Sequence, residues 1–341
     1  MGNSFVYVTR GGIRESEHFG SIAVVSSSGK LLAHYGDPNY VTFARSSAKP
    51  MQAIPLVESG AVETFLFDES DLAQCCASHS SELQHTERVL SMLQKIGLDE
   101  SYLQCGPHIP HSMETYDRLI RAGKALTSLY SNCSGKHTGM LAYSKHIGAD
   151  LSTYYEINHP LQQTILSAVS ELTDVPKDRI VIGRDGCGVP TFALPIANFA
   201  LSYARFTNPE GLKHGEAMKR ISAAMRSYPE LVGGTDRFDT DLMKVTNGRI
   251  LAKVGAEGFI IAADTIRKFA LAIKVQDGNS RAIPPAVIRT LAAMDALSSE
   301  EREWLHKYEE PELLNTRGEK IGNIIADFEL EFKSSAHVTA S

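Results

Sequence analysis

The hydrophobic positions of the chain form strand-like runs near both ends and recur at helical spacing in the middle. Ser21–Val25 and Lys30–Ala33 flank a turn rich in serine and glycine, which predicts a β-hairpin. Between them and the later strands, apolar residues three or four positions apart predict four helices, over residues 86–96, 117–126, 140–146 and 161–172. The middle of the chain is therefore expected to be mostly helical.

The pattern changes after Pro229. Short apolar runs and an Asn247-Gly248 turn signal predict successive antiparallel strands over residues 242–245, 250–254, 259–262 and 269–273. Pro285–Leu297 predicts an amphipathic helix that covers one face of that sheet. We therefore expect an α+β (αβα) fold in which helices flank an antiparallel sheet. The expected arrangement is a single catalytic unit, 1–333, with a sheet region from about 1–60 and 180–333, a helical region of about 61–179, and a polar tail at 334–341.

The composition is that of a globular protein with a small polar substrate. Of the 341 residues, 43% are hydrophobic and 22% are charged, enough to bury one large core or two modest ones. The net charge of -6, without a basic cluster, argues against nucleic acid as a partner. No apolar stretch approaches the roughly 20 residues that span a bilayer. Because the N-terminus also lacks a secretory signal, we expect a cytoplasmic protein.

The five cysteines do not suggest a disulfide framework. Their number is odd, and Cys75 and Cys76 are adjacent, which is a poor geometry for a structural bridge. Cys75, Cys76 and Cys105 are interpreted as small buried apolar residues. Cys133 and Cys187 have different surroundings, and they enter the chemistry below.

A serine and a lysine three residues apart are the most informative chemical feature. In Ser46-Ser47-Ala48-Lys49, which precedes Pro50 and an apolar helical run, the Lys49 amine can reach the Ser46 hydroxyl and accept its proton if it is uncharged. Far downstream, Lys253-Val254-Gly255 supplies a second amine on a predicted strand. The combination of Ser-x-x-Lys with Lys-x-Gly is typical of serine acyl-transfer enzymes.

Five motifs in this order resemble the asparaginase II family, the serine-lysine L-asparaginases: Arg45–Pro50, Ala77–Ser80, Asn132–His137, Asp185–Gly188 and Ala252–Gly258. The resemblance covers nearly the whole chain. It implies a fold similar to that of serine β-lactamases and glutaminases, L-asparagine as substrate, a zinc ion, and a homodimer.

The motifs supply the groups that amide hydrolysis needs. Ser46 is the expected nucleophile and Lys49 its base. Ser78, which the resemblance pairs with Lys253, could relay a proton to the leaving nitrogen, with Ser80 as a local competitor. Which of the two lysines is the neutral base is left open. The amides of Ser46 and Ala256 are candidate oxyanion donors, by analogy with β-lactamase-like sites, because Gly255 lets the backbone approach the substrate.

Three further polar residues could have a functional or a structural role. Arg45 could hold the substrate's α-carboxylate or pair with an acidic surface residue. Asp185 could bind the α-ammonium group or orient the neighbouring cysteine cluster, or it could simply cap the turn at Gly186. His79 lies between two serines, and we interpret it as a structural histidine with satisfied hydrogen bonds.

The metal ligands are also open. From the side chains that usually bind zinc, we would expect Cys133, His137 and Cys187 as ligands, because a cysteine and a histidine four residues apart share a helical face. The resemblance implies Lys136 in place of His137, a rare ligand whose amine must first lose a proton. With three protein ligands the metal would position groups in the site rather than generate the nucleophile.

We therefore expect an L-asparagine amidohydrolase that forms an acyl-enzyme. The alternatives are a glutaminase or another small-amide hydrolase, since one methylene in a pocket is worth only about 1–3 kcal/mol, an enzyme whose zinc-bound water is the nucleophile, and a catalytically silent amino-acid-binding protein. A β-lactam substrate is disfavoured by the missing export signal.

Overall fold

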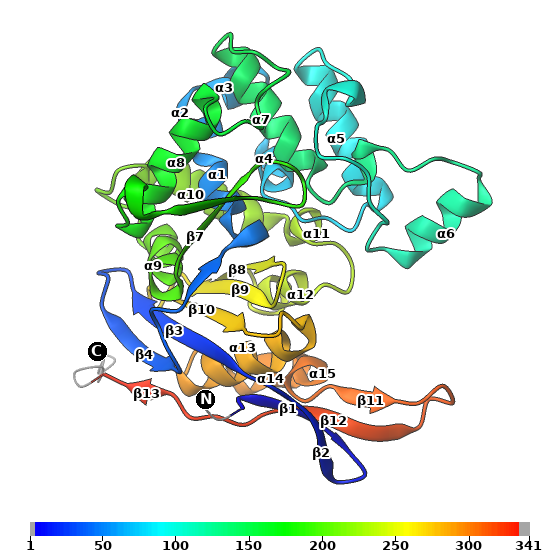
Figure 1. Ribbon diagram of the computed structural model, residues 1–341, viewed down its shortest axis with the longest axis vertical. Coiled ribbons are helices and arrows are strands. Elements are labelled where there is room, and N and C mark those ends of the chain that lie inside the picture. Colours follow the sequence, from blue (N-terminus) through cyan, green and yellow to red (C-terminus); the bar gives the residue numbers. More distant parts are fainter. Residues whose placement is uncertain (1–3, 334–341) are drawn as a thin grey trace. The chain divides into compact units, whose positions relative to one another are not determined.

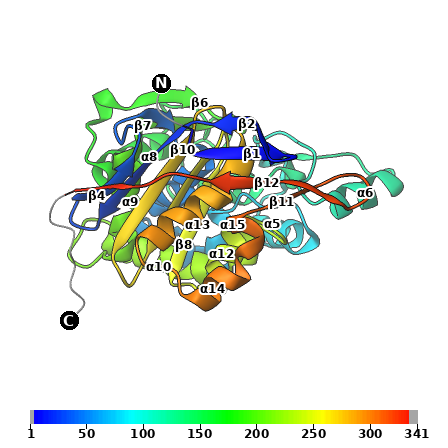
Figure 2. The ribbon, with the colours of Figure 1, turned by 90° about the horizontal axis from the view of Figure 1, so that it is seen from below.

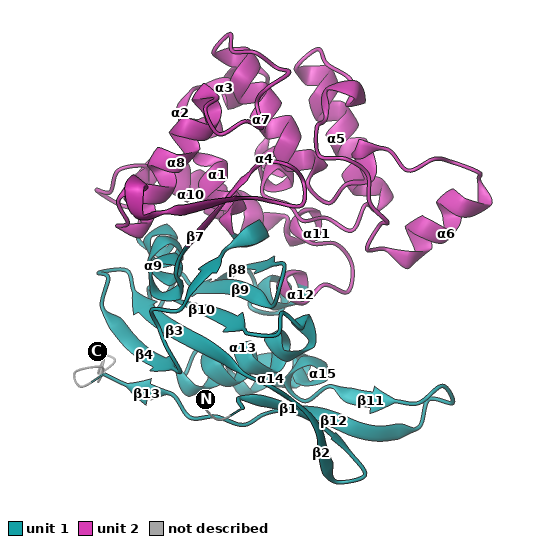
Figure 3. Ribbon diagram, viewed as in Figure 1, with its two compact units in different colours: residues 1–47, 194–208, 241–341 teal, residues 48–193, 209–240 magenta. Residues whose placement is uncertain are grey.

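The computed structural model describes residues 4–333, and the predicted polar tail at 334–341 lies outside them. The chain divides into two compact units (Figure 3): unit 1 contains residues 1–47, 194–208 and 241–341, and unit 2 contains residues 48–193 and 209–240. These boundaries differ from the predicted ones. The mostly helical unit begins at residue 48 instead of 61, and it also takes in residues 180–193 and 209–240.

Unit 1 is built on a six-stranded sheet with the order β13-β4-β3-β10-β9-β8 (Figure 1). Neighbouring strands are antiparallel throughout. The strands are β3 (Gly20–Ser26), β4 (Leu31–Tyr35), β8 (Ile250–Gly255), β9 (Phe259–Asp264), β10 (Phe269–Val275) and β13 (Glu331–Phe332). The predicted hairpin and three of the four predicted later strands are thus confirmed.

Helices cover both faces of this sheet. α9 (Ile196–Thr207) contacts β3, β9 and β10, and α13 (Ile283–Ala293) contacts β10 from the other side (Figure 2). Every residue of β10 is buried, as expected for a strand covered on both faces. Unit 1 therefore has the predicted αβα arrangement, and with the helices of unit 2 the fold is α+β.

A second sheet of unit 1 joins segments from the two ends of the chain. Its order is β11-β12-β1-β2, and Val6 of β1 pairs with Ala326 of β12. The strands are β1 (Val6–Arg10), β2 (Ile13–His18), β11 (Glu312–Leu314) and β12 (Lys320–Ala326). The remaining elements of this unit are β5 (Val41–Phe43), α14 (Ser299–Trp304) and α15 (His306–Glu309). The sequence did not indicate this sheet.

The strand predicted over residues 242–245 is wrong. These residues belong to a helix, α12 (Phe238–Val245), in which Phe238 and Leu242 lie one turn apart and are both buried. A four-residue apolar run fits a buried strand and a buried helical turn equally well. The Asn247-Gly248 turn is present, with positive φ angles of 48° and 71°, and it separates α12 from β8.

Unit 2 is mainly helical. Its helices are α1 (Lys49–Gln52), α2 (Ile54–Glu58), α3 (Ala61–Thr64), α4 (Glu69–Cys75), α5 (Leu83–Lys95), α6 (Met113–Arg121), α7 (Ser134–His146), α8 (Pro160–Thr173), α10 (Gly215–Ser227) and α11 (Pro229–Val232). A hairpin is formed by β6 (Val181–Arg184) and β7 (Pro190–Pro195). Within residues 4–333, no helix has the length and hydrophobicity needed to cross a membrane.

Two of the helices predicted for the middle of the chain match α5 and α8 closely, and a third matches the end of α7, which begins at Ser134 instead of residue 140. The fourth, α6, starts and ends earlier than predicted. Its N-cap is Ser112, whose hydroxyl accepts a hydrogen bond from the backbone N–H of Thr115, and Gly123 has a positive φ angle just after its end.

Candidate active site

The serine-lysine motif lies on a short helical segment. Residues Arg45–Ala48 form a 3-10 helix that continues directly into α1, with Pro50 in its first turn. Arg45 has a φ angle of +50°, which is unusual for a residue with a side chain. Ser46 is half-buried, and Lys49 is 1% exposed. Left-handed backbone geometry of this kind is often kept at functional sites.

In unit 1 this segment is fixed to the end of β8. The Ser47 hydroxyl donates a hydrogen bond to the backbone carbonyl of Lys253 over 2.8 Å, and the Tyr203 hydroxyl donates to the Ser47 carbonyl over 2.8 Å. A Cβ atom on Gly255 would lie 2.6 Å from the Ala44 carbonyl oxygen. The predicted nucleophile Ser46 and Lys253 therefore belong to one neighbourhood of unit 1.

The candidate oxyanion donors are also in unit 1. Ser46 lies in the first turn of a helix, where backbone N–H groups have no partner within the helix. Ala256 follows the last residue of β8. Among residues 4–333 no backbone hydrogen bond from either N–H group is found outside the regular elements. Both groups stay candidate donors, while the Lys253 amine is fully buried and donates to the Val254 carbonyl.

In unit 2, Lys49 meets Ser78. The Lys49 Nζ atom donates to the Ser78 Oγ atom over 2.9 Å, to the Ala77 carbonyl, and to the Asn132 carbonyl over 3.5 Å. The three acceptors lie 28, 29 and 83 residues away from Lys49 along the chain, so none of them is local to α1. The resemblance pairs Ser78 with Lys253, whereas the amine that contacts the Ser78 hydroxyl within unit 2 is that of Lys49. Sequence reasoning missed the Asn132 carbonyl as a contact of this amine.

Ser80 and His79 have other partners. The Ser80 hydroxyl donates to the Gly233 carbonyl over 3.1 Å, which ties it to the backbone. The His79 Nδ1 atom accepts from the Ser81 backbone N–H, so its Nε2 atom carries the proton and donates to the Ser134 hydroxyl over 2.9 Å. Burial lowers the pKa of His79 well below its ordinary value, and it stays neutral. Its interpretation as a structural histidine agrees with these contacts.

The two cysteines and the lysine of the proposed metal site are together in unit 2. Cys133 and Cys187 share a hydrogen bond, and the Lys136 Nζ atom donates to the Cys187 Sγ atom over 2.9 Å. All three side chains are buried. α7 begins directly after Cys133, which places Lys136 in its first turn, and Cys187 lies in the turn between β6 and β7. Cys75, Cys76 and Cys105 are free and buried, as predicted.

The cluster favours a thiolate on one cysteine. The hydrogen bond from Cys133 lowers the pKa of Cys187 to about 5, although burial opposes it, and Lys136 adds to the effect. The same bond and burial raise the pKa of Cys133 to about 12. Burial disfavours the Lys136 ammonium, but the neighbouring thiols and Asp185 outweigh it and raise its pKa. In this cluster Cys133 is thus a neutral thiol, Cys187 a thiolate and Lys136 an ammonium.

His137 contacts Tyr154 through one ring nitrogen, and its other ring nitrogen, Nε2, is buried with no hydrogen-bond partner found in residues 4–333. Its Nδ1 atom lies 2.6 Å from the Tyr154 hydroxyl, and burial lowers its pKa to about 3. No group of three His, Cys, Asp or Glu side chains arranged for a metal occurs in residues 4–333, so the set of Cys133, His137 and Cys187 is not assembled there. Lys136, the other candidate for the third ligand, is in contact with one of the two cysteines.

The two substrate-binding candidates have local contacts. The Asp185 Oδ1 atom accepts from the Gly186 backbone N–H over 2.8 Å, and its Oδ2 atom lies 4.0 Å from Cys187 Sγ. The turn-capping and cluster-orienting readings of Asp185 thus both have a contact. The Arg45 guanidinium is half-buried in unit 1, where its charge contributes to lowering the pKa of Lys274, chiefly a consequence of burial.

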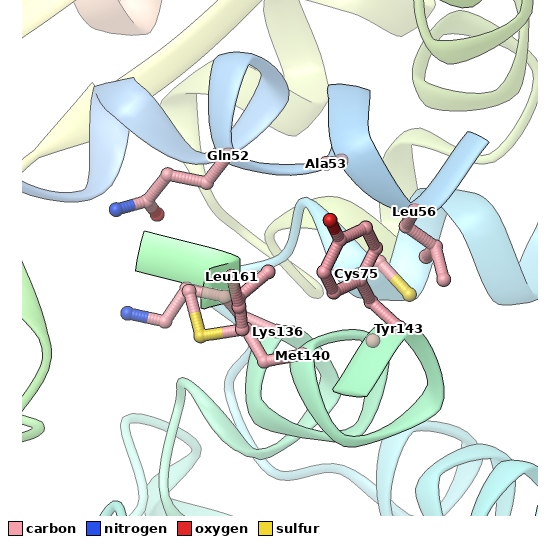
Figure 4. A pocket seen from close by; sticks show the side chains of 9 residues that line it. Gln52, Ala53, Leu56, Cys75, Lys136, Met140, Tyr143 and Leu161 are labelled. Atoms are coloured by element: carbon pink, nitrogen blue, oxygen red, sulfur yellow. The ribbon is translucent and has the colours of Figure 1, made fainter. Parts of the chain in front are cut away.

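A small cavity lies next to Lys136 in unit 2 (Figure 4). It is lined by Gln52, Ala53, Leu56, Cys75, Lys136, Gly139, Met140, Tyr143 and Leu161. Its volume of ≈ 10 Å³ holds at most one water molecule, so it is not a substrate pocket. In Figure 4 the Gln52 amide and the Lys136 amine both point to the same side, away from Cys75.

Comparisons with known proteins add the family. The sequence profile of the L-asparaginase II family matches residues 6–326. No curated protein matches the chain. Among solved structures, a β-lactamase from Mycobacterium bovis has 15% identity and a TM-score of 0.42, and covers 82% of this chain and 95% of its own. A D-alanine carboxypeptidase from Burkholderia cenocepacia has 13% identity and a TM-score of 0.37 over 85% and 92%. A Bacillus glutaminase has 15% identity and a TM-score of 0.32 over 84% and 88%.

The profile match covers nearly all of the 341 residues and includes the five motifs described above. The protein therefore belongs to the L-asparaginase II family and is an amidohydrolase.

Proposed function

We propose that the protein hydrolyses L-asparagine to L-aspartate and ammonia through an ester formed on Ser46. The observation that carries the proposal is the buried Lys49 amine, 2.9 Å from the Ser78 hydroxyl and three residues after Ser46 on one helical segment. This arrangement offers a nucleophile, a base and a second hydroxyl for proton transfer. A small polar substrate is what the family implies.

The proposed reaction has two steps. Lys49, whose Nζ atom donates to three acceptors in the structure, first releases one proton to solvent. The uncharged amine then takes the proton of the Ser46 hydroxyl while the serine oxygen bonds to the side-chain carboxamide carbon. The carbon–nitrogen bond then breaks, and the nitrogen leaves as ammonia with a proton relayed through the Ser78 hydroxyl. Water next attacks the ester carbon, the Ser46 oxygen regains a proton, and L-aspartate is released.

Other side chains bind the substrate in this proposal. The backbone N–H groups of Ser46 and Ala256 stabilise the oxyanion, and each such donor is typically worth about 10²–10³ in kcat. Arg45 holds the α-carboxylate, and Asp185 binds the α-ammonium group. The Lys253 amine, in the neighbourhood of Ser46, supplies the second positive charge or the second base.

We also propose a zinc ion on Cys133, Lys136 and Cys187. The buried thiols and the amine in contact suit zinc, which prefers sulfur and nitrogen ligands, once Lys136 has lost its proton. When bound, the ion would supply a fixed positive charge that positions substrate groups. In the protein itself the Asp185 carboxylate lies 4.0 Å from Cys187 Sγ and attracts the Lys136 ammonium.

A cytoplasmic homodimer stays a prediction.

The test is ammonia release from asparagine and from glutamine, with and without a chelator. Wild type is compared with Ser46→Ala, and Ser91→Ala, an exposed serine on α5, is the matched control. We expect asparagine to be the better substrate, Ser46→Ala to lose at least about 10³-fold in kcat, and Ser91→Ala to retain parental activity. Mass spectrometry of quenched wild type should show an aspartyl ester on the Ser46 peptide.

Each alternative has its own outcome in this assay. Faster turnover of glutamine would replace the substrate assignment. Binding of asparagine without ammonia release in both wild type and Ser46→Ala would indicate an amino-acid-binding protein. A Ser46→Ala variant that turned over at the parental rate, and lost all activity with chelator, would make zinc-bound water the nucleophile.

A further inference from the structure

We infer that Glu82 is a positioning residue of the proposed reaction: its carboxylate clamps residues 232–235 against residues 77–82 and thereby fixes Ser78 beside Lys49. The inference rests on the proposed role of Ser78. We call residues 77–82 the serine loop and residues 232–235 the glycine segment. Both lie in unit 2.

Three sets of hydrogen bonds join the two stretches in register. At one end the Ser78 backbone N–H donates to the Val232 carbonyl over 2.8 Å, and in the middle the Ser80 hydroxyl donates to the Gly233 carbonyl. At the other end Glu82 accepts twice from Thr235. Its Oε1 atom lies 2.7 Å from the Thr235 backbone nitrogen, and its Oε2 atom lies 3.1 Å from the Thr235 hydroxyl.

The serine loop and the glycine segment are closely packed against each other. Gly234 has a φ angle of +121°, which favours glycine, and a Cβ atom there would lie 2.6 Å from Ser80 Oγ and 2.7 Å from Glu82 Oε1. Ser81 has a φ angle of +63°, and its backbone N–H and hydroxyl are both engaged, by His79 and by the Tyr130 carbonyl. The serine loop is therefore a strained turn held by outside contacts.

The Glu82 side chain does not cap its own helix. Glu82 is the N-cap residue of α5, but its carboxylate makes no capping hydrogen bond there and reaches Thr235 instead. Partial burial raises the pKa of this carboxyl, but hydrogen bonds from the Thr235 backbone and from Gln84 outweigh it, and the net pKa lies below its ordinary value. The ionised carboxylate, with two acceptor oxygens, is thus the form that accepts both hydrogen bonds from Thr235.

These contacts link Glu82 to the chemistry. The Ser78 N–H is held by the glycine segment, and the Ser78 Oγ atom is the acceptor of the Lys49 amine. If Glu82 releases Thr235, the glycine segment can move away and Ser78 moves with it. Displacements of about 1 Å at a reacting group cost on the order of 10²-fold in rate.

The experiment is a double-mutant cycle in the full-length protein, with kcat and KM for asparagine measured by ammonia release. Glu82→Ala is made alone and together with Ser78→Ala, and Glu87→Ala, an exposed glutamate on α5, is the matched control. We expect Glu82→Ala to lower kcat about 10- to 100-fold, with KM changed less than about threefold. In the Ser78→Ala background its further effect should be less than about threefold, because the two residues act through one another.

Two additional variants keep the test decisive if Glu82→Ala does not fold. Thr235→Val removes only the hydroxyl contact and should lower kcat in part, whereas Thr235→Ser keeps both contacts and should restore the parental rate. Equal losses from Glu82→Ala with and without Ser78, or a parental rate for Glu82→Ala and for Thr235→Val, overturn the clamp. A parental rate for Ser78→Ala instead removes the proton relay from the proposed function, and the clamp with it.

Discussion

Replacing Gly255 by alanine tests how the nucleophile is placed on β8. A Cβ atom at this position would lie 2.6 Å from the Ala44 carbonyl oxygen and 3.0 Å from Ser47 Oγ. Ordinary contact begins near 3.4 Å. The backbone at Ala44 must therefore retreat by about 0.8 Å, the difference between 3.4 and 2.6 Å, and the Ser47 hydrogen bond to the Lys253 carbonyl is strained at the same time.

The retreat should reduce both stability and activity. Overpacking of this size costs about 1–3 kcal/mol of folding free energy. Because Ser46 lies between Ala44 and Ser47 in the sequence and moves with them, and a misplacement near 1 Å costs on the order of 10²-fold in rate, we expect kcat to fall about 10- to 100-fold. The assays are ammonia release from asparagine and the thermal unfolding midpoint.

Gly318→Ala is the matched control in the same unit. Its φ angle of +78° makes alanine strained there, but no atom lies within 4 Å of the new Cβ. It should lower the unfolding midpoint and leave kcat at the parental value. Full activity in Gly255→Ala, at any stability, would refute the placement of Ser46 against the end of β8. Equal activity losses in both variants would assign the effect to strain alone.

Two further predictions concern buried amines and thiols. Lys49→Met should lower kcat by about 10²–10⁴-fold, as for loss of a general base, and Lys49→Arg should not rescue it, because a guanidinium stays charged; recovery in Lys49→Arg, measured by ammonia release, would contradict a neutral base at this position. In metal-free protein, Cys187 has a folded pKa of about 5 against about 8.5 when unfolded, so its thiolate adds stability that is fully present above pH ~8.5 and lost as the pH falls through about 5. The unfolding midpoint of wild type relative to that of Cys187→Ser should therefore rise as the pH is raised from about 5 to about 8.5. A difference that stays constant over this range would contradict the thiolate.

Long, continuous apolar strands were predictable from the sequence because their burial is complete. β9 and β10 are buried at every position, so their residues are nearly all apolar and the pattern has one interpretation. The sheet that pairs β1 with β12 was not predictable. Its strands are short and partly exposed, and their pairing joins residues some 320 positions apart, for which no local signal exists.

The site was predictable as a list of residues but not as a set of contacts. The motif spacing named both Ser78 and Ser80, and only the fold separates them, since the Ser80 hydroxyl is tied to the Gly233 carbonyl while Ser78 meets Lys49. Similarly, the cysteine–histidine spacing on a helical face favoured His137 as a metal ligand. Its Nδ1 atom contacts Tyr154, a partner 17 residues away that the spacing rule cannot include, and its Nε2 atom is buried with no hydrogen-bond partner found in residues 4–333.

The anchoring of Ser46 explains why a strained residue precedes it. On the unit 1 side, Ser47 is bonded through its hydroxyl to β8 and through its carbonyl to Tyr203. On the unit 2 side, the Lys49 amine is held by three acceptors. Strain at Arg45 persists only if neighbouring contacts over-determine the backbone, and these contacts do so on its C-terminal side. Among residues 4–333 no hydrogen bond of the Ser46 hydroxyl is found, whereas the side chains of Ser47 and Lys49 on the same segment are both hydrogen-bonded.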